Sequence, residues 1–257
     1  NKDGSFNATT SIKGKIEFKN VTFAYPLTGD KKILDNINLV IKPGETIGIL
    51  GETGCGKTSL INLIPRFYDV CEGSVLVDDI DVREYNLKNL RERISVALQK
   101  SEIFQSTIKE NIQWGRENAT NNDIANAASI AQAMEFISTS TDGFDTLVTQ
   151  QGTSLSGGQK QRIAISRTIL KQSEIIIFDD ATSALDLKTE ASLYSMLKNA
   201  YPDTTKIIIA QRIASVKDAD RIVILDDGHI SAVGTHDELL KNSAIYQDIY
   251  NSQLNKK

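Results

Sequence analysis

The sequence predicts an α/β fold with a mostly parallel sheet on two observations, together with a helical insertion that departs from this pattern. Short apolar runs with the length of buried strands recur along the chain, for example Thr46–Leu50 and Ile175–Phe178. Segments with a helical spacing of apolar residues, such as Lys57–Phe67, lie between these runs, and alternating strands and helices form parallel sheets covered on both faces. An Ala-, Asn- and Ile-rich stretch from about Thr107 to Ser140 predicts a helical subdomain inserted at about residues 101–159.

Two strands are expected before the first helix, because apolar residues alternate over Ile16–Phe23 and again over Ile37–Ile41. We expect them to form an antiparallel β subdomain near the N-terminus. Pro65 should shorten the first helix, and Asn121 or Asn122 is the expected N-cap in the inserted stretch. The remaining expected strands are Val75–Val77, Ser95–Leu98, Lys206–Ile209 and Ile222–Leu225, and the remaining expected helices are Gln159–Leu170, His236–Lys241 and Ala244–Gln253.

Composition and charge limit the classes of protein that fit. The 257 residues are 40% hydrophobic and 24% charged with a net charge of −4, which is typical of a globular protein and argues against a general nucleic-acid binder. The two cysteines, Cys55 and Cys71, are too few for a disulfide framework and fit a reducing compartment. No apolar run approaches the roughly 18 residues of a membrane-spanning helix, so we expect a chain that is soluble by itself. The first fourteen or so residues have the composition of a tail or linker.

A phosphate-binding loop, and with it a P-loop NTPase core, is predicted where the strand Thr46–Leu50 ends. The sequence from Gly51 to Thr58, GETGCGKT, has the pattern G-x-x-x-x-G-K-[ST] between a strand and a helix, a context that disfavours a chance glycine-rich turn. Its glycines let backbone N–H groups surround phosphates, Lys57 can reach the outer phosphates, and the Thr58 hydroxyl can bind Mg²⁺. The expected ligands are ATP and Mg²⁺, and the expected ATP-binding residues of this segment are Gly51, Glu52, Thr53, Gly54, Cys55, Gly56, Lys57, Thr58 and Ser59.

Two interpretations of Cys55 remain open. The simpler one is that Cys55 fills a position in the loop that needs a small residue. In the other, the helix N-terminus and Lys57 make its thiol reactive, and bound ATP would then shield it from alkylation.

Two further motifs follow the phosphate loop. The apolar run Ile175–Phe178 ends in Asp179 and Asp180, at a strand end where α/β sheets place ligands; Asp179 suits Mg²⁺, although it could be a turn residue. The sequence LSGGQ, from Leu155 to Gln159, places a serine and two glycines before a helix and predicts a second anion-binding helix start. One nucleotide does not need two such sites from one chain, so the second is expected to serve a second chain.

These motifs, in this order, resemble those of the ATP-binding-cassette (ABC) family over nearly the whole chain, from about Lys15 to about Ser252. In that family two domains pair head to tail and sandwich two ATPs. The resemblance implies that residues 15–257 form an ABC nucleotide-binding domain at the cytoplasmic face of the cell membrane, and that residues 1–14 link it to a membrane domain. Its partners would be a second nucleotide-binding domain and the transmembrane domains of an exporter, without nucleic acid.

The resemblance also implies roles for single residues. Tyr25 matches the aromatic that stacks on adenine, with a core tyrosine as the alternative, and Gln99 matches the glutamine that senses Mg²⁺ and the transport domains. The segments Ile103–Ile112 and Gly234–Leu239 are similar to those of exporters, in which the first receives coupling helices. The residues expected at the partner's ATP are Leu155, Ser156, Gly157, Gly158, Gln159 and Asp186, and the expected Mg²⁺ ligands are Thr58, Gln99 and Asp179.

Two departures from the family pattern predict weak hydrolysis. Asp180 stands where a competent member has the glutamate that polarises the attacking water, and its shorter side chain draws the carboxylate back. Gln211 stands in place of the switch histidine, and glutamine cannot shuttle a proton or carry charge. A smaller departure is Gln150, near which exporters usually have an acidic residue. The residues expected to act in catalysis are Lys57, Asp180, Gln211 and Gln99.

Several functional interpretations remain open at this stage. The departures resemble the degenerate half of a heterodimeric exporter, whose LSGGQ completes the partner's site; a slow homodimer is the alternative. A soluble ABC ATPase of DNA repair or translation and a non-hydrolytic nucleotide-gated dimerisation module are two further classes. Because the signature sequence LSGGQ is expected far from the phosphate loop of the same chain, the isolated chain should be an ATPase of low activity.

Overall fold

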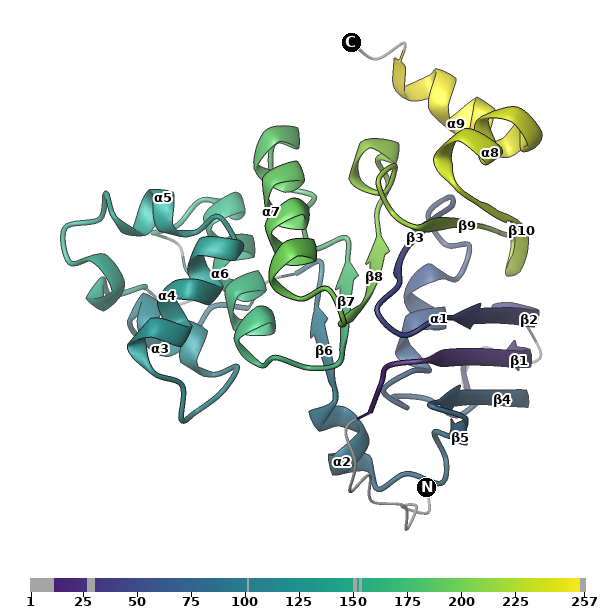
Figure 1. Ribbon diagram of the computed structural model, residues 1–257, viewed down its shortest axis with the longest axis horizontal. Coiled ribbons are helices and arrows are strands. Elements are labelled where there is room, and N and C mark those ends of the chain that lie inside the picture. Colours follow the sequence, from purple (N-terminus) through teal and green to yellow (C-terminus); the bar gives the residue numbers. More distant parts are fainter. Residues whose placement is uncertain (1–11, 27–30, 101, 150–151, 153, 255–257) are drawn as a thin grey trace. The chain divides into compact units, whose positions relative to one another are not determined.

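The computed structural model describes residues 12–26, 31–100, 102–149, 152 and 154–254. These residues divide into two compact units, one formed by the residues up to Ile94 together with those from Asp203 onward, and the other by Ser95–Pro202 (Figure 1). Among the described residues, no helix has both the length and the apolar character needed to cross a bilayer.

The first unit contains an antiparallel sheet of the order β2-β1-β4-β5. Its strands are β1 (Ile16–Phe23), β2 (Leu34–Ile41), β4 (Glu72–Val77) and β5 (Ile80–Asp81). Ile16 lies opposite Ile41 of β2 and Val77 of β4, and all three side chains are buried. This sheet confirms the predicted N-terminal antiparallel β subdomain.

The parallel strands of the first unit position the phosphate loop. Strand β3 (Thr46–Leu50) pairs in parallel with β8 (Thr205–Ile209) and β9 (Arg221–Asp226), and β10 (His229–Gly234) pairs antiparallel with β9. Every residue of β3 and β8 is buried, as expected for parallel strands covered on both faces. The helices of this unit are α1 (Lys57–Asn62), α2 (Leu87–Glu92), α8 (His236–Asn242) and α9 (Ala244–Leu254).

The second unit is mainly helical and contains the neighbouring strands β6 (Ile94–Ala97) and β7 (Ile175–Asp179). Helix α6 packs against α3 and α4, which lie in the inserted stretch (Figure 1). The helices are α3 (Ile108–Gln113), α4 (Asn121–Ile130), α5 (Met134–Ile137), α6 (Gly157–Leu170) and α7 (Leu187–Ala200), with a 3-10 turn η1 (Gly143–Asp145). The fold is therefore α/β with one antiparallel and one mostly parallel sheet, as predicted; the subdomain boundaries at 101 and 159 stay predictions.

Several local expectations need correction. The N-cap of α4 is Thr120 rather than Asn121 or Asn122, because the Thr120 hydroxyl accepts from the Asp123 N–H at 3.2 Å and the Asp123 carboxylate accepts from the Thr120 N–H at 2.9 Å. Helix α6 begins at Gly157, two residues earlier than expected. Strand β6 begins and ends one residue earlier than the expected strand Ser95–Leu98, since it covers Ile94–Ala97.

Residues 12–14, assigned to the linker, belong to the folded part of the first unit. Ile12 is buried, and the N–H groups of Lys13 and Lys15 donate to the Asp78 carboxylate at 2.6 and 2.8 Å. The carbonyl of Gly14 accepts from the Thr205 hydroxyl at 2.8 Å. Residues 1–11 lie outside the described residues.

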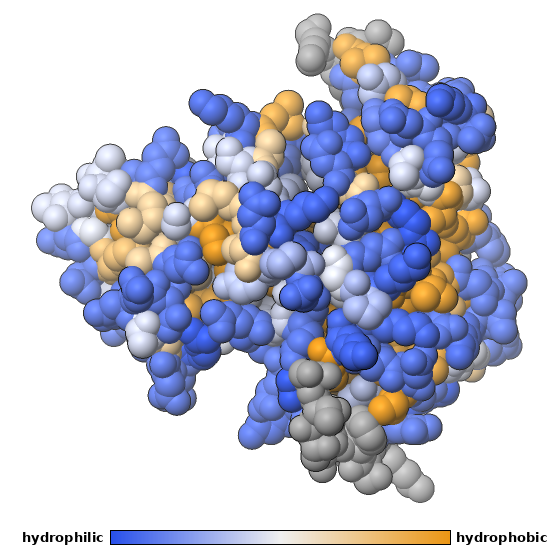
Figure 2. Space-filling model, in the orientation of Figure 1, coloured by the Kyte–Doolittle hydropathy of each residue, from blue (hydrophilic) through white to orange (hydrophobic). Residues whose placement is uncertain are grey.

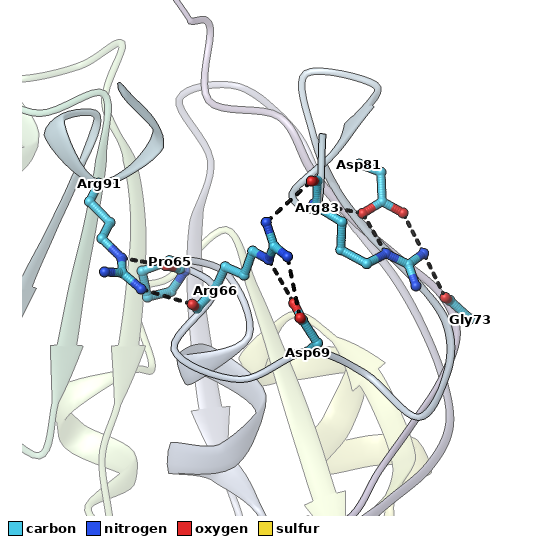
Figure 3. Close-up of polar contacts among 7 residues, drawn as sticks. All are labelled: Pro65, Arg66, Asp69, Gly73, Asp81, Arg83 and Arg91. Carbon is cyan, nitrogen blue, oxygen red and sulfur yellow. Dashed lines mark hydrogen bonds and ion pairs between the residues drawn. The ribbon is translucent and has the colours of Figure 1, made fainter. Parts of the chain in front are cut away.

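A cluster of arginines fixes the chain after α1, which ends at Asn62 ahead of Pro65 (Figure 3). The buried Arg66 guanidinium forms an ion pair with Asp69 at 2.7 Å and donates to the carbonyl of Arg83 at 3.2 Å. Arg91 of α2 donates to the carbonyls of Pro65 and Arg66 at 3.1 and 2.9 Å. These bonds pair the carbonyls of Pro65, Arg66 and Arg83 with arginine side chains and hold the turn that follows α1.

Replacing Arg66 by alanine should lower the free energy of unfolding by about 2 kcal/mol, because it removes the bonds of a buried guanidinium to the half-buried Asp69 and to the carbonyl of Arg83. The Arg66 side chain is only 5% exposed. Arg83 is the matched control: it pairs with Asp81 at 2.6 Å but is 43% exposed, so Arg83→Ala should cost less than about 1 kcal/mol. Urea unfolding of both variants checks this; equal losses would contradict it.

Candidate functional site

The phosphate loop follows β3 and depends on glycine at two crowded positions. A Cβ at Gly51 would lie 2.1 Å from the carbonyl oxygen of Leu225 in β9. A Cβ at Gly56, whose φ is 106°, would lie 2.8 Å from the Leu34 side chain. The loop can therefore lie this close to β9 and β2 only with glycine at both places.

Lys57, the first residue of α1, spans the loop. Its Nζ donates to the carbonyls of Gly51 and Glu52, each at 2.7 Å, and the residue is buried. The loop residues Glu52, Thr53 and Gly54 are exposed, and so is Thr58. A cation thus lies beneath an exposed backbone turn, an arrangement that suits a polyanion bound from outside.

The Cys55 thiol lies inside the loop, with its Sγ 3.8 Å from Lys57 Nζ. Burial raises the pKa of the Cys55 thiol, and the nearby Lys57 charge only partly opposes this. A reactive cysteine needs a lowered pKa and access to solvent. The structure therefore favours Cys55 as a small space-filling residue.

Tyr25 contacts the first turn of α1 directly. Its hydroxyl shares a hydrogen bond with the Ser59 hydroxyl at 2.9 Å. Its ring packs edge to face against Phe23, with centroids 4.9 Å apart, and against Tyr68 at 5.0 Å. The ring is held beside the phosphate loop and is partly exposed, which distinguishes it from a core tyrosine.

Gln211 also belongs to the first unit. Strand β8 ends at Ile209, Ala210 is buried, and Gln211 is the first exposed residue beyond the strand. Sequence reasoning therefore placed Gln211 correctly in the segment that follows β8.

The second unit holds the acidic pair. Asp179 ends β7 and is buried, whereas Asp180 is half-buried and has a left-handed backbone with φ of 49°. Non-glycine residues with this conformation gather at functional sites and turns. The next segment is fixed by Thr182, whose hydroxyl bonds to Glu190 and lies 3.3 Å from the Tyr194 hydroxyl. Gln99 is exposed two residues beyond β6.

The signature sequence lies at the start of α6. The Ser156 hydroxyl accepts from the Gln159 N–H at 3.3 Å, and the Gln159 side chain accepts from the Ser156 N–H at 2.9 Å. Ser156 and Gly157 are exposed, and Leu155 is half-buried. This capping box leaves other N–H groups of the first turn directed at the exposed end of the helix.

The start of α6 is joined to the segment Ser183–Asp186 by contacts that sequence reasoning missed. A Cβ at Gly158 would lie 3.0 Å from the carbonyl of Ala184. The buried Gln161 side chain donates to the Ser183 hydroxyl at 3.1 Å and accepts from the Ala184 N–H at 2.9 Å. In the sequence these contacts are indicated only by a polar residue, Gln161, on the inner face of α6.

Asp186 is the N-cap of α7. Hydrogen bonds from the N–H and hydroxyl of Thr189 lower the pKa of the Asp186 carboxyl, so the residue is ionised at neutral pH. Asp186 is exposed, and the structure places it in the same unit as the signature sequence.

The candidate residues therefore fall into two groups. The first unit contains Tyr25, the loop from Gly51 to Ser59, and Gln211; the second contains Gln99, Asp179, Asp180, Leu155–Gln159 and Asp186. Gln150 lies outside the described residues. The donors expected for Mg²⁺, a hydroxyl, a carboxylate and an amide oxygen, are all hard oxygen ligands, and their chemistry fits Mg²⁺.

Comparisons with known proteins identify the family of the chain. The family model described as ABC transporter matches residues 34–183. The ATP-dependent lipid A-core flippase of Hahella chejuensis is 40% identical over 256 residues, covering 99% of this chain and 44% of the flippase. ABC transporter B family member 4 of Dictyostelium discoideum is 41% identical over 245 residues, covering 95% of this chain and 32% of that protein.

A solved structure of a bacterial Atm1-family ABC exporter with ATP bound has a TM-score of 0.91 and 35% identity, covering 97% of this chain and 43% of that one. The chain spans less than half the length of each of these relatives. The chain belongs to the ABC transporter family and is homologous to the nucleotide-binding domains of ABC exporters.

Proposed function

We propose that the chain binds Mg·ATP and is the motor domain of an ABC exporter. The observation that carries this proposal is the phosphate loop, with buried Lys57 beneath the exposed residues Glu52, Thr53 and Gly54. Backbone N–H groups of the loop bind the phosphates, and Lys57 exchanges its carbonyl partners for phosphate oxygens. Tyr25, fixed by Ser59, stacks on the adenine.

Mg²⁺, when bound, neutralises charge on the outer phosphates. The Thr58 hydroxyl and the Asp179 carboxylate would hold it, and Gln99 would supply a further oxygen donor. The position of Asp179 as the last residue of β7 supports this role, because α/β sheets place ligands at the carboxyl ends of their strands.

Hydrolysis by this domain is weak. Asp180 orients the attacking water with a carboxylate one methylene shorter than that of glutamate, and Gln211 bonds the γ-phosphate without carrying charge. This combination defines the degenerate half of a heterodimeric exporter. A non-hydrolytic nucleotide-gated module is the second candidate function, and the same two residues favour it; measurable turnover separates the two.

The domain works in a head-to-tail pair. Ser156, Gly157 and the ionised Asp186 are exposed in one unit, and the bonds of Gln161 join their segments. Together with Leu155, Gly158 and Gln159, these residues complete the ATP site of a second nucleotide-binding domain with a competent site. The exposed N-terminus of α6 supports this pairing, because the N–H groups of a helix N-terminus bind anions such as phosphate.

Exporter transmembrane domains are the other partner, which places the domain at the cytoplasmic face of the membrane. Phe104 and Trp114 stack with centroids 4.6 Å apart, and Trp114 is 67% exposed. Figure 2 shows further hydrophobic residues at the surface of the helical part of the second unit. An exposed aromatic pair of this kind suits a protein interface.

Replacing Ser156 by arginine tests the pairing. In the purified chain the head-to-tail pair can form only between two copies of this chain. Mg·ATP should shift the unaltered chain toward this homodimer, and Ser156→Arg should weaken the association by roughly thirtyfold or more, as other interface hot spots do. The affinity of the chain for ATP should stay within about twofold, because its own phosphate loop is untouched. Sedimentation velocity with and without Mg·ATP measures the association. Ser154→Arg is the matched control, an exposed serine two residues earlier; equal effects of both variants would refute the pairing.

A further inference from the structure

The C-terminal helix α9 reaches the segment that contains Gln211. The Gln253 carboxamide donates from Nε2 to the carbonyl of Gln211 at 2.8 Å and accepts at Oε1 from the N–H of Ile213 at 2.9 Å. One side chain thus binds the backbone on both sides of Arg212. Such two-point pairing resembles one rung of a β-ladder and fixes a backbone in position as well as in orientation.

The same segment is also held from the side of the sheet. Val216 is buried against β3, where a Cβ at Gly48 would lie 2.6 Å from the Val216 Cβ. Ile213 is buried as well, in the short 3-10 helix η3 (Ile213–Ser215). The segment from Gln211 to Val216 therefore lies between a packed strand and the helix that presents Gln253.

Helix α9 is itself firmly anchored. Tyr246 is fully buried, and its hydroxyl shares a hydrogen bond with His236 Nδ1 at 2.6 Å. Gln247 donates to the carbonyl of Leu240 at 2.7 Å. Gln253 follows Tyr246 by two helical turns and so lies on nearly the same face of the helix.

We propose that Gln253 is a positioning residue that holds Gln211 in place for the reaction at the γ-phosphate. This inference rests on the proposed function, in which Gln211 meets that phosphate. The residue type matters, because a carboxamide offers a donor and an acceptor side by side. A glutamate would keep the bond from Ile213 but lose the one to Gln211.

The inference predicts that Gln253→Ala slows turnover without loosening ATP binding. We expect kcat to fall at least about tenfold, since small misplacements of a reacting group cost that much, while KM for ATP stays within about twofold. The measurement uses the full chain with Gln211 in place and Asp180→Glu added, which should raise the slow turnover of the unaltered chain into a range where kcat is measured accurately. The kcat of Gln253→Glu should lie between that of Gln253→Ala and that of the chain with Gln253 in place. The control is Gln247→Ala, a glutamine of the same helix that contacts Leu240 instead, and it should leave both constants unchanged.

Amide hydrogen exchange supplies a second readout on the same samples. In Gln253→Ala the Ile213 amide should exchange faster, while the Tyr246 amide keeps its protection because α9 stays docked. If α9 undocks, the glutamate variant, which keeps the side-chain length, takes the place of alanine in the kinetic comparison. Turnover in Gln253→Ala equal to that in Gln247→Ala, or unchanged Ile213 exchange, would overturn this inference alone. Absence of turnover in every chain would overturn the proposed hydrolysis and this inference with it.

Discussion

Lys57→Ala should reduce the affinity of the chain for Mg·ATP by on the order of a hundredfold or more. Lys57 Nζ donates two bonds within the loop, and on binding these are replaced by bonds to charged phosphate oxygens. Hydrogen bonds to charged groups contribute about 1.5–3 kcal/mol each, and 1.4 kcal/mol corresponds to tenfold in affinity. Calorimetric titration with Mg·ATP measures the change.

The control for this prediction is Lys42→Ala. Lys42 is exposed and lies just before β3, at the end of the strand opposite the phosphate loop, so its loss should change the affinity less than twofold. Thermal unfolding of both variants shows whether the loop still folds without Lys57. A folded Lys57→Ala chain with normal ATP affinity would mean that the loop is not the nucleotide site.

The double variant Asp180→Glu/Gln211→His should raise ATP turnover by on the order of a hundredfold at unchanged ATP affinity. Glutamate extends the carboxylate by one methylene toward the attacking water, and a misplacement of about 1 Å can cost that factor. Histidine adds a side chain that can carry charge at the γ-phosphate. Phosphate release under steady-state conditions measures the gain.

The single variants and Asp180→Asn complete this experiment. Each single change should raise ATP turnover less than the double change does. The two effects should not be additive, because both side chains act on one transition state. Asp180→Asn should remove the residual turnover of the unaltered chain, since an amide is a poor base. A double variant no faster than the unaltered chain would contradict the assignment of a degenerate site.

The phosphate loop was predictable because its chemistry is local. The strand Thr46–Leu50 has the predicted bounds, and α1 begins at the predicted Lys57, since an apolar run, three glycines and a lysine determine strand, turn and helix within a few residues. The predicted N-cap of α4 was wrong because Thr120, Asn121 and Asn122 are all suitable N-cap residues. The reciprocal hydrogen bonds between Thr120 and Asp123 make Thr120 the N-cap. Short elements such as α2 and β10 have too little periodicity to stand out.

The contacts that orient the candidate residues could not be predicted. Gln161 meets Ala184 and Gln253 meets Gln211, 23 and 42 residues away along the chain. Only the packing of α6 and α9 brings these residues together, and no spacing rule in a single sequence expresses such a contact. The position of Gln211 after β8 was predictable, but what holds it was not.

The central claim is that this chain binds ATP firmly and hydrolyses it slowly, and the most direct test measures both on the purified, unaltered chain. Equilibrium binding of Mg·ATP and steady-state phosphate release are recorded on the same preparation. We predict saturable binding of one ATP per chain and a turnover far below the roughly 10 s⁻¹ typical of enzymes. Brisk turnover would make Asp180 a fully working base and contradict the degenerate site, and the absence of saturable binding would contradict the whole account.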